Sequence, residues 1–126
     1  MPDELEIRWR DLDPYGHVNH AVYLTYLEEL RDDWLARTLR LGGVWDYVVA
    51  RIAVDYRREL RPADGPVRCD FAVVRVGRTS VTTSERLVTA AGEEAAAAEA
   101  VLVAVERASG RPRPLGEEER KRLGGS

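Results

Sequence analysis

The sequence contains one cysteine, Cys69, and two histidines, His17 and His20. A single cysteine excludes an internal disulfide framework and fits a reducing compartment. No apolar run reaches the length of about 18 residues that a membrane-spanning helix needs. The first stretch, "MPDELEIRWR", is acidic and lacks the apolar core of a signal peptide. We therefore expect a cytoplasmic protein without a membrane segment.

An excess of positive charge is also missing. The chain has 19 Lys and Arg against 22 Asp and Glu, a formal net charge of −3, with both signs interspersed. This balance argues against a nucleic-acid partner, because no basic stripe dominates the sequence. The length of 126 residues suffices for one domain with a real core and is too short for two. We therefore expect a single domain over residues 1–126.

The N-terminal part of the sequence predicts a strand, a loop and a long helix. In "ELEIRWR", Leu5, Ile7 and Trp9 alternate with charged residues, which is typical of a half-buried strand. "DLDPYGHVNH" contains proline and glycine and is predicted as a loop. Asn19 is suited to cap a helix over residues 21–40, which "LGG" would end. The first half of this helix is apolar nearly all round, so other elements should enclose it.

Four strand-like runs follow the helix. Their expected inward-facing residues in the first two runs are Val48, Ala50, Ile52, Val54 and Tyr56, then Val67, Cys69, Phe71 and Val73. The third run, 77–89, is rich in Thr and Val, which suit a pleated surface. The fourth, 93–107, has the alanines of a helix but ends in "VLVAV", and we predict a strand. With a short helix in "GEEERKRL", the order predicts a two-layer α+β domain, one helix on an antiparallel sheet.

The loop before the helix concentrates the reactive side chains. Asp13, His17 and His20 could be metal ligands, yet the sequence offers no second ligand cluster, and we expect no metal. Asp13 precedes a proline and could simply start a turn. However, a carboxylate just upstream of a helix N-terminus faces unpaired N–H groups that can hold a polarised carbonyl oxygen. A base beside such donors suits acyl transfer, and this pattern favours a carboxylate-led hydrolysis.

The stretch "RWRDLDPYGHVNHAVYLTYLEELR", together with the strand pattern after it, resembles the hotdog-fold acyl-CoA thioesterases. The resemblance is strongest to the 4-hydroxybenzoyl-CoA thioesterase-like branch and covers about 5–115, including "VARIAVDYRRELRPAD" and "AVLVAVERASGRPRPL". It implies a long helix wrapped by a curved antiparallel sheet of about five strands. It also implies homodimers or homotetramers with active sites at the subunit interface, acyl-CoA as substrate and no cofactor.

The resemblance also assigns roles to residues of the loop. Asp13 matches the catalytic carboxylate, acting either as the nucleophile or as a general base on water. The backbone N–H of His20 matches the oxyanion donor, and its side chain matches a histidine that orients substrate or water. His17 and Asn19 belong to "HVN", which replaces more apolar residues of the hydroxybenzoyl-specific enzymes and favours a fatty acyl substrate. Asn19 could alternatively serve only as the helix cap.

Three further positions have competing interpretations. Tyr15 either lines the acyl pocket or lies on the surface. Arg78 either binds the CoA phosphates, as a basic residue does at this place in the family, or is a plain surface arginine. Glu28 and Glu29 match a second catalytic carboxylate of a different hotdog branch, but we expect them on a solvated helix face.

The function predicted from these residues is hydrolysis of an acyl-CoA thioester to a free carboxylic acid and CoA. A thioesterase acting on acyl carrier protein would use the same residues, so this alternative stays open. A non-catalytic acyl-CoA-binding module is a second alternative, which the presence of Asp13 disfavours. A hotdog dehydratase or hydratase would need a motif on a different loop, and the sequence lacks it.

Overall fold

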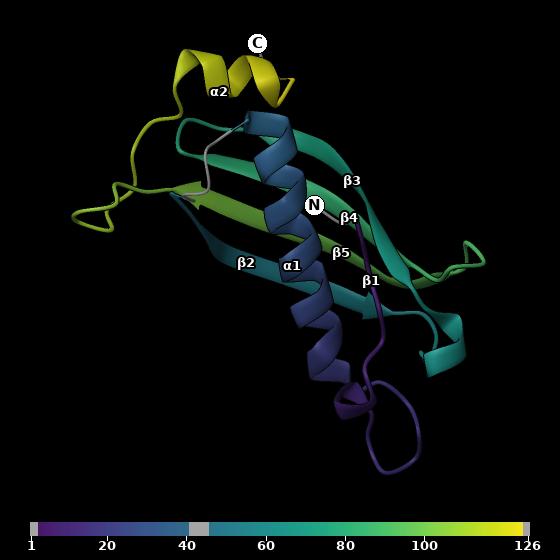
Figure 1. Ribbon diagram of the computed structural model, residues 1–126. Helices are drawn as coiled ribbons and strands as arrows, with labels where there is room; N and C mark the ends of the chain where they lie inside the picture. Colours follow the sequence, from purple (N-terminus) through teal and green to yellow (C-terminus); the bar gives the residue numbers. More distant parts are fainter. Residues whose placement is uncertain (1–2, 41–45, 125–126) are drawn as a thin grey trace.

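The computed structural model describes residues 3–40 and 46–124; the predicted "LGG" helix stop lies outside these ranges. The strands form one antiparallel sheet in the order β1-β3-β4-β5-β2, and α1 crosses one face of it (Figure 1). The elements in chain order are β1 (Glu4–Leu5), a 3-10 turn (Trp9–Asp11), α1 (His20–Leu39), β2 (Tyr47–Tyr56), a 3-10 turn (Pro62–Asp64), β3 (Val67–Val76), β4 (Ser80–Val88), β5 (Glu94–Ala104) and α2 (Glu117–Arg122).

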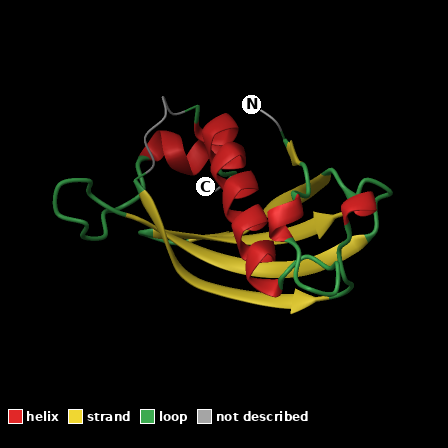
Figure 2. Cartoon of the chain, turned by 60° about the horizontal axis from the view of Figure 1, so that its bottom comes forward, coloured by secondary structure: helices red, strands yellow, loops and turns green. Residues whose placement is uncertain are grey.

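The predicted architecture is confirmed. The sheet curves around α1, as Figure 2 shows, and gives the two layers expected of a hotdog fold. The ambiguous alanine-rich run forms strand β5, and the C-terminal run forms the short helix α2. Alanines suit β5 because the helix packs directly above it: Ala96 and Ala100 are completely buried.

The first strand is much shorter than predicted. Only Glu4 and Leu5 pair with β3, and the chain then turns into a 3-10 helix at Trp9–Asp11. The turn forms because the Asp11 carboxylate accepts the backbone N–H of Arg8 at 2.9 Å. Trp9 is consequently 87% exposed, so its predicted place on the buried face is wrong.

A β-bulge also overturns part of the prediction for β2. The register passes from Val49 opposite Leu102 to Arg51 opposite Val101, which leaves Ala50 as the extra residue. One extra residue reverses the inward and outward alternation. Ile52 therefore packs on the core as predicted, whereas Val48, which precedes the bulge, is 51% exposed and lies on the other face. The predicted inward positions of Val48 and Ala50 are wrong.

The core lies between α1 and the inner face of the sheet. Helix residues Tyr23, Tyr26, Leu27 and Leu30 are buried, and the inward set predicted for β3 packs against the core clusters. Trp34 is only partly buried and stacks on Phe71 with ring centroids 5.1 Å apart. Although the first half of α1 is largely apolar, no helix in the described ranges is long and apolar enough to span a bilayer.

A buried ion pair joins α1 to β4. The Arg31 guanidinium donates two hydrogen bonds of 2.7 Å to the Glu85 carboxylate, and Thr83 donates a third bond to Glu85 at 2.8 Å. Arg31 is 3% exposed and Glu85 is 0% exposed. Burial alone would lower the pKa of Arg31, but the hydrogen bonds and charge of Glu85 raise it above its ordinary value. The two side chains therefore form a hydrogen-bonded ion pair in the interior.

A second polar cluster attaches the C-terminal segment to the end of the sheet where β2 begins. Glu119, on α2, accepts two hydrogen bonds from the Arg113 guanidinium at 2.8 and 3.0 Å and one from the Tyr47 hydroxyl. The hydrogen bonds from Arg113, with further help from Tyr47, lower the pKa of Glu119 to about 2. This cluster attaches α2 to the start of β2.

We expect Glu85→Gln to lower the free energy of unfolding by about 3–5 kcal/mol, because it leaves the Arg31 charge buried without a counter-charge. Urea denaturation followed by circular dichroism measures the loss. Glu99→Gln is the matched control, since it breaks an ion pair with Arg51 whose two side chains are 54% and 63% exposed. The control should lose less than about 1 kcal/mol. Equal losses in the two variants would contradict a special role for the buried pair.

Candidate active site

Backbone hydrogen bonds within the loop that leads into α1 hold it in a compact turn. Leu12 and Val18 form an isolated β-bridge, and the Asp13 N–H donates to the His17 carbonyl at 2.7 Å. Gly16 adopts a φ of 80° at the turn, a conformation that a residue with a side chain rarely takes. The glycine and proline that predicted a loop therefore build a tight turn that presents Asp13.

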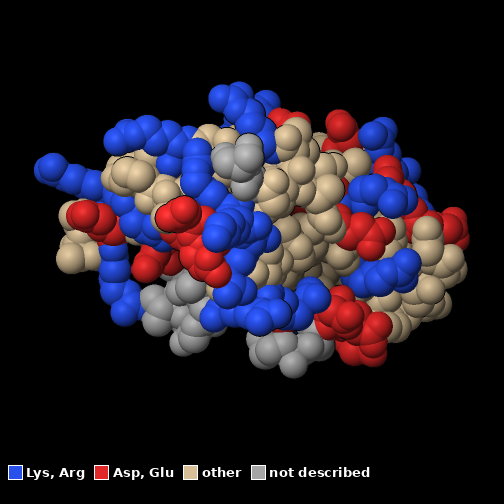
Figure 3. Space-filling model, turned by 90° about the horizontal axis from the view of Figure 1, so that it is seen from above, with Lys and Arg blue, Asp and Glu red and all other residues tan. Residues whose placement is uncertain are grey.

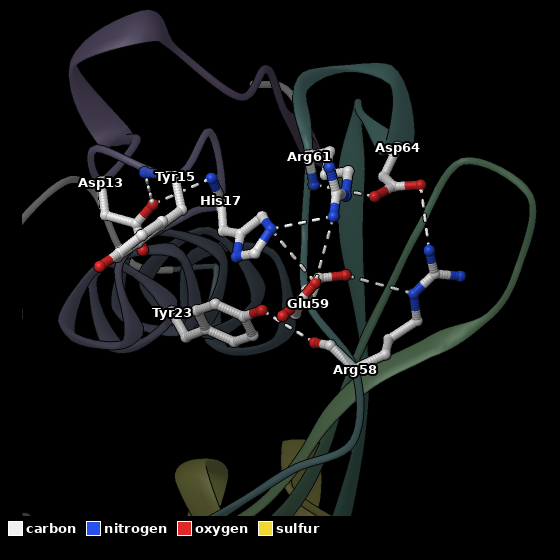
Figure 4. A network of polar contacts seen from close by, with 8 residues as sticks. All are labelled: Asp13, Tyr15, His17, Tyr23, Arg58, Glu59, Arg61 and Asp64. Carbon is white, nitrogen blue, oxygen red and sulfur yellow. Dashed lines mark hydrogen bonds and ion pairs between the residues drawn. The ribbon is translucent and has the colours of Figure 1, made fainter.

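Only one oxygen of the Asp13 carboxylate accepts hydrogen bonds from the described residues. Its Oδ1 accepts the backbone N–H groups of Tyr15 at 2.9 Å and His17 at 3.1 Å, as Figure 4 shows. Among the described residues, Oδ2 has neither a hydrogen bond nor an ion pair. A cavity of about 520 Å³ adjoins this carboxylate; it is lined by Trp9, Arg10, Leu12, Asp13, Pro14 and Gly16. The turn interpretation of Asp13 is thus confirmed, and one oxygen remains available for chemistry.

The N-terminus of α1 offers a backbone donor next to this loop. The Asn19 side chain accepts the N–H of Ala21 at 2.9 Å, so the predicted helix cap is confirmed. The Asn19 carbonyl accepts the N–H of Val22, also at 2.9 Å. Within the part of the chain that the structure describes, the N–H of His20, the first helical residue, has no acceptor. The partial positive charge of a helix N-terminus favours an anion there.

The His20 side chain lies against the end of β2. Its ring stacks on Tyr56 with centroids 4.6 Å apart and an interplanar angle of 28°. The Tyr56 hydroxyl donates to the His20 carbonyl at 3.2 Å. No sequence pattern indicated this contact, because Tyr56 was expected only as one of the inward residues of its strand.

His17 joins the loop to the segment between β2 and β3. Its Nε2 lies 2.9 Å from the Arg61 guanidinium and 3.3 Å from the Glu59 carboxylate (Figure 4). The backbone supports the same junction, since the Val18 N–H donates to the Leu60 carbonyl at 2.8 Å. These partners of His17 were missed from the sequence, because nothing in a local pattern brings residues 59–61 to this loop.

Asp11 anchors the other side of the loop. It is 5% exposed, accepts the Tyr26 hydroxyl at 2.5 Å and accepts the Arg8 backbone and side chain. Burial raises the pKa of Asp11, but the hydrogen bonds from Tyr26 and Arg8 outweigh it, and the net effect is a lowered pKa. Desolvation and the bond to Asp11 raise the pKa of Tyr26. Asp11 is therefore a charged structural anchor.

Residues 7–123 match the thioesterase-like superfamily. The chain belongs to this superfamily. A thioesterase from Thermus thermophilus, solved in complex with coenzyme A and zinc, is 39% identical, with a TM-score of 0.82 over 95% of this chain and 88% of that one. A predicted thioesterase from Bacillus stearothermophilus is 27% identical, with a TM-score of 0.83 over 96% of this chain and 91% of that one.

A curated relative gives a shorter match. The long-chain acyl-CoA thioesterase FadM of Escherichia coli is 37% identical over 62 residues, which are 46% of this chain and 47% of FadM. The matched part thus spans about half the length of that relative. Together with the superfamily match and the solved structures, it confirms the resemblance to hotdog-fold thioesterases that the loop and helix motif predicts.

The remaining residues predicted for this thioesterase site lie apart from Asp13 or point to solvent. Tyr15 is 82% exposed at the loop tip. Arg78 is exposed in the turn between β3 and β4, at the end of the sheet where α2 lies (Figure 1). Glu28 and Glu29 are exposed on α1, as expected of a solvated helix face. One copy of the chain therefore does not bring Arg78 to the loop.

No metal centre is found in the described ranges: they contain no group of three or more His, Cys, Asp or Glu placed to hold an ion. The two histidines make different contacts, His17 with Arg61 and Glu59 and His20 with Tyr56.

Proposed function

We propose that this member of the thioesterase-like superfamily is an acyl-CoA thioesterase, which converts an acyl-CoA to a free carboxylic acid and CoA. One observation carries the proposal. One oxygen of Asp13 is held by backbone N–H groups, and the other has no partner among the described residues. The same loop leads into α1, where the N–H of His20 has no acceptor in the described ranges. The relatives named for coenzyme A and for long-chain acyl-CoA support this substrate class.

The mechanism uses the two unpaired groups of the loop. The thioester carbonyl oxygen accepts the His20 N–H, and the helix N-terminus stabilises the negative charge that develops there. Asp13 Oδ2 either attacks the carbonyl carbon or removes a proton from the attacking water. If Asp13 attacks, the carbon–sulfur bond breaks as an acyl-aspartate anhydride forms, and water then hydrolyses this anhydride and frees the carboxylate. If water attacks, the carbon–sulfur bond breaks when the tetrahedral intermediate collapses. On both routes the CoA thiolate takes up a proton from water or from the protonated Asp13 and leaves as the thiol, and the oxygen of water ends in the carboxylic acid. Asn19 fixes the helix start.

The acyl group is proposed to be fatty rather than hydroxybenzoyl, on the basis of the "HVN" stretch. Tyr15 and His17 are proposed to border the acyl group at the loop, and the single Cys69 supports a cytoplasmic location. A panel of acyl-CoA esters of varied chain length and aromaticity, assayed by thiol release, tests the substrate class. Faster release from benzoyl than from fatty esters would contradict the acyl assignment.

Assembly is proposed to complete the site. β2 forms an edge of the sheet and exposes apolar side chains, with Val48 51%, Val49 43% and Tyr56 42% exposed. An unpaired apolar edge invites pairing with a second strand. A two-fold antiparallel pairing of β2 with a second copy brings the start of one β2 beside the end of the other.

This pairing supplies a phosphate contact that one copy lacks. The turn with Arg78 adjoins the start of β2, because the Ala104 N–H donates to the Thr79 carbonyl and Ala104 lies opposite Tyr47. Arg120 reaches the same turn and donates to the Gly77 carbonyl at 2.7 Å. Figure 3 views this end of the molecule and shows many Lys and Arg side chains over it. We propose that Arg78 of the second copy binds the CoA phosphates.

Asp13→Asn is nearly isosteric and keeps the oxygen that accepts the two turn N–H groups, so the loop should fold as before. The variant loses the basic and nucleophilic oxygen, and we expect kcat to fall at least about a hundredfold. Thiol release from a fatty acyl-CoA measures it, and light scattering should show an unchanged oligomer. A variant that retained most of its activity would reduce Asp13 to a turn residue.

A lysine in place of Val48 should disrupt the edge pairing, because it would place a charge in an apolar contact at both ends of the paired strands. We expect the wild type to be a dimer or tetramer at micromolar concentration and Val48→Lys to be a monomer with little activity, measured by light scattering and thiol release. Val74→Lys is the control: this residue of β3 is 57% exposed and is separated from β2 by β4 and β5, so its variant should keep at least the dimer. A fully active wild-type monomer would refute the shared site.

Arg78→Ala should raise KM for acyl-CoA more than it lowers kcat, because a phosphate contact far from the thioester contributes mostly uniform binding. The difference from wild type should shrink as salt rises. An acyl-pantetheine thioester, which lacks the nucleotide phosphates, should be unaffected. Arg68→Ala, an exposed arginine at the other end of β3, controls for net charge. Equal losses with both substrates would instead indicate a structural role for Arg78.

A further inference from the structure

Three aromatic rings attach the start of α1 to the end of β2. His20 stacks on Tyr56 at 4.6 Å and meets Tyr23 edge-on at 6.0 Å, while Tyr23 and Tyr56 pack edge-to-face at 5.1 Å. Tyr23 is 1% exposed and its hydroxyl donates to the Arg58 carbonyl, so it belongs to the core. Tyr56, in contrast, is 42% exposed. Its contacts with His20 therefore call for an explanation other than core packing.

The backbone around His20 is held from both sides. On the N-terminal side, the Asn19 carbonyl accepts the Val22 N–H, which fixes the peptide plane that contains the His20 N–H. On the C-terminal side, the Tyr56 hydroxyl donates to the His20 carbonyl at 3.2 Å. The stacked ring also removes rotational freedom from the His20 side chain. First-turn residues otherwise tend to fray, because their N–H groups lack partners within the helix.

We infer that Tyr56 is a positioning residue, which holds the backbone N–H of His20 in the direction needed to stabilise the oxyanion. The inference rests on the proposed thioesterase function. A preorganised donor stabilises developing charge only while it points at the position the oxyanion will occupy. A first turn that fluctuates would weaken this interaction in the transition state. It would hardly affect binding of the CoA portion of the substrate.

The test compares Tyr56→Phe, which keeps the stacked ring and loses the hydroxyl, with Tyr56→Leu, which loses both. Tyr47→Phe is the matched control: it removes a tyrosine hydroxyl hydrogen bond, to Glu119, at the opposite end of the same strand. We expect kcat for a fatty acyl-CoA to fall about threefold to tenfold in Tyr56→Phe, the effect of losing one neutral hydrogen bond. It should fall further in Tyr56→Leu, with KM within about twofold of wild type in both.

Proton NMR detects the stacking of His20 on Tyr56 without any substrate or catalytic reaction. Stacking on Tyr56 places the His20 ring protons in its ring current, so their proton NMR shifts should move in Tyr56→Leu. They should stay near the wild-type values in Tyr56→Phe and Tyr47→Phe. Light scattering of each variant checks that the oligomer is retained. If Tyr56→Leu dissociates, the nearly isosteric Tyr56→Phe decides the kinetic comparison.

Equal kcat values in Tyr56→Phe and Tyr47→Phe, or a rise in KM in place of a fall in kcat, would overturn the positioning role and leave the thioesterase assignment intact. His20 shifts that do not respond to Tyr56→Leu would overturn it as well. A wild-type protein that hydrolyses no acyl-CoA in the panel would overturn the proposed function itself, and this inference with it.

Discussion

The buried pair of Arg31 and Glu85 determines how α1 lies on the sheet. Two 2.7 Å hydrogen bonds join a helix and a central strand in a region from which water is excluded. A helix rotated by one residue, about 100°, would separate Arg31 from Glu85 and leave the Glu85 carboxylate buried without its counter-charge, at a cost of several kcal/mol. With Arg31 directed at β4, Tyr23 and Leu27 face the core. The pair thus selects one orientation of α1 out of several that its largely apolar first half would allow.

The orientation of α1 also fixes the contacts of the loop that precedes it. Tyr26 reaches Asp11, and Asp11 holds the 3-10 turn and accepts the Asn19 N–H through its carbonyl. Two groups of this region have no partner within the described part of the chain and matter for the proposed mechanism: Oδ2 of Asp13 on the loop and the N–H of His20 at the helix start. The proposed mechanism assigns the chemistry to these two groups, because neither is held by another contact of the loop.

The sequence was informative where structure is local. Alternation located the inner face of β3, Asn19 was recognisable as a cap, and Pro14 and Gly16 marked the loop. The predictions failed where a contact between distant residues or one extra residue decides the outcome. The bulge at Ala50 reversed the first part of β2, although its composition is that of a regular strand. The partners of His17 and of Arg31 lie 42 or more positions away in the chain, beyond any local pattern.

Strand β2 connects the proposed chemistry with the proposed assembly. Its first residue, Tyr47, contacts α2, and its last, Tyr56, contacts the start of α1. The 20 residues of α1 extend for about 30 Å, so the loop with Asp13 and the turn with Arg78 lie at opposite ends of one copy. A substrate with a thioester at one end and phosphates at the other needs both kinds of group within its own length. The proposed antiparallel pairing at β2 would meet this requirement with two identical chains, because it would place the basic end of each copy beside the Asp13 loop of the other. The exposed edge strand β2 is thereby the feature on which the proposed two-chain site depends.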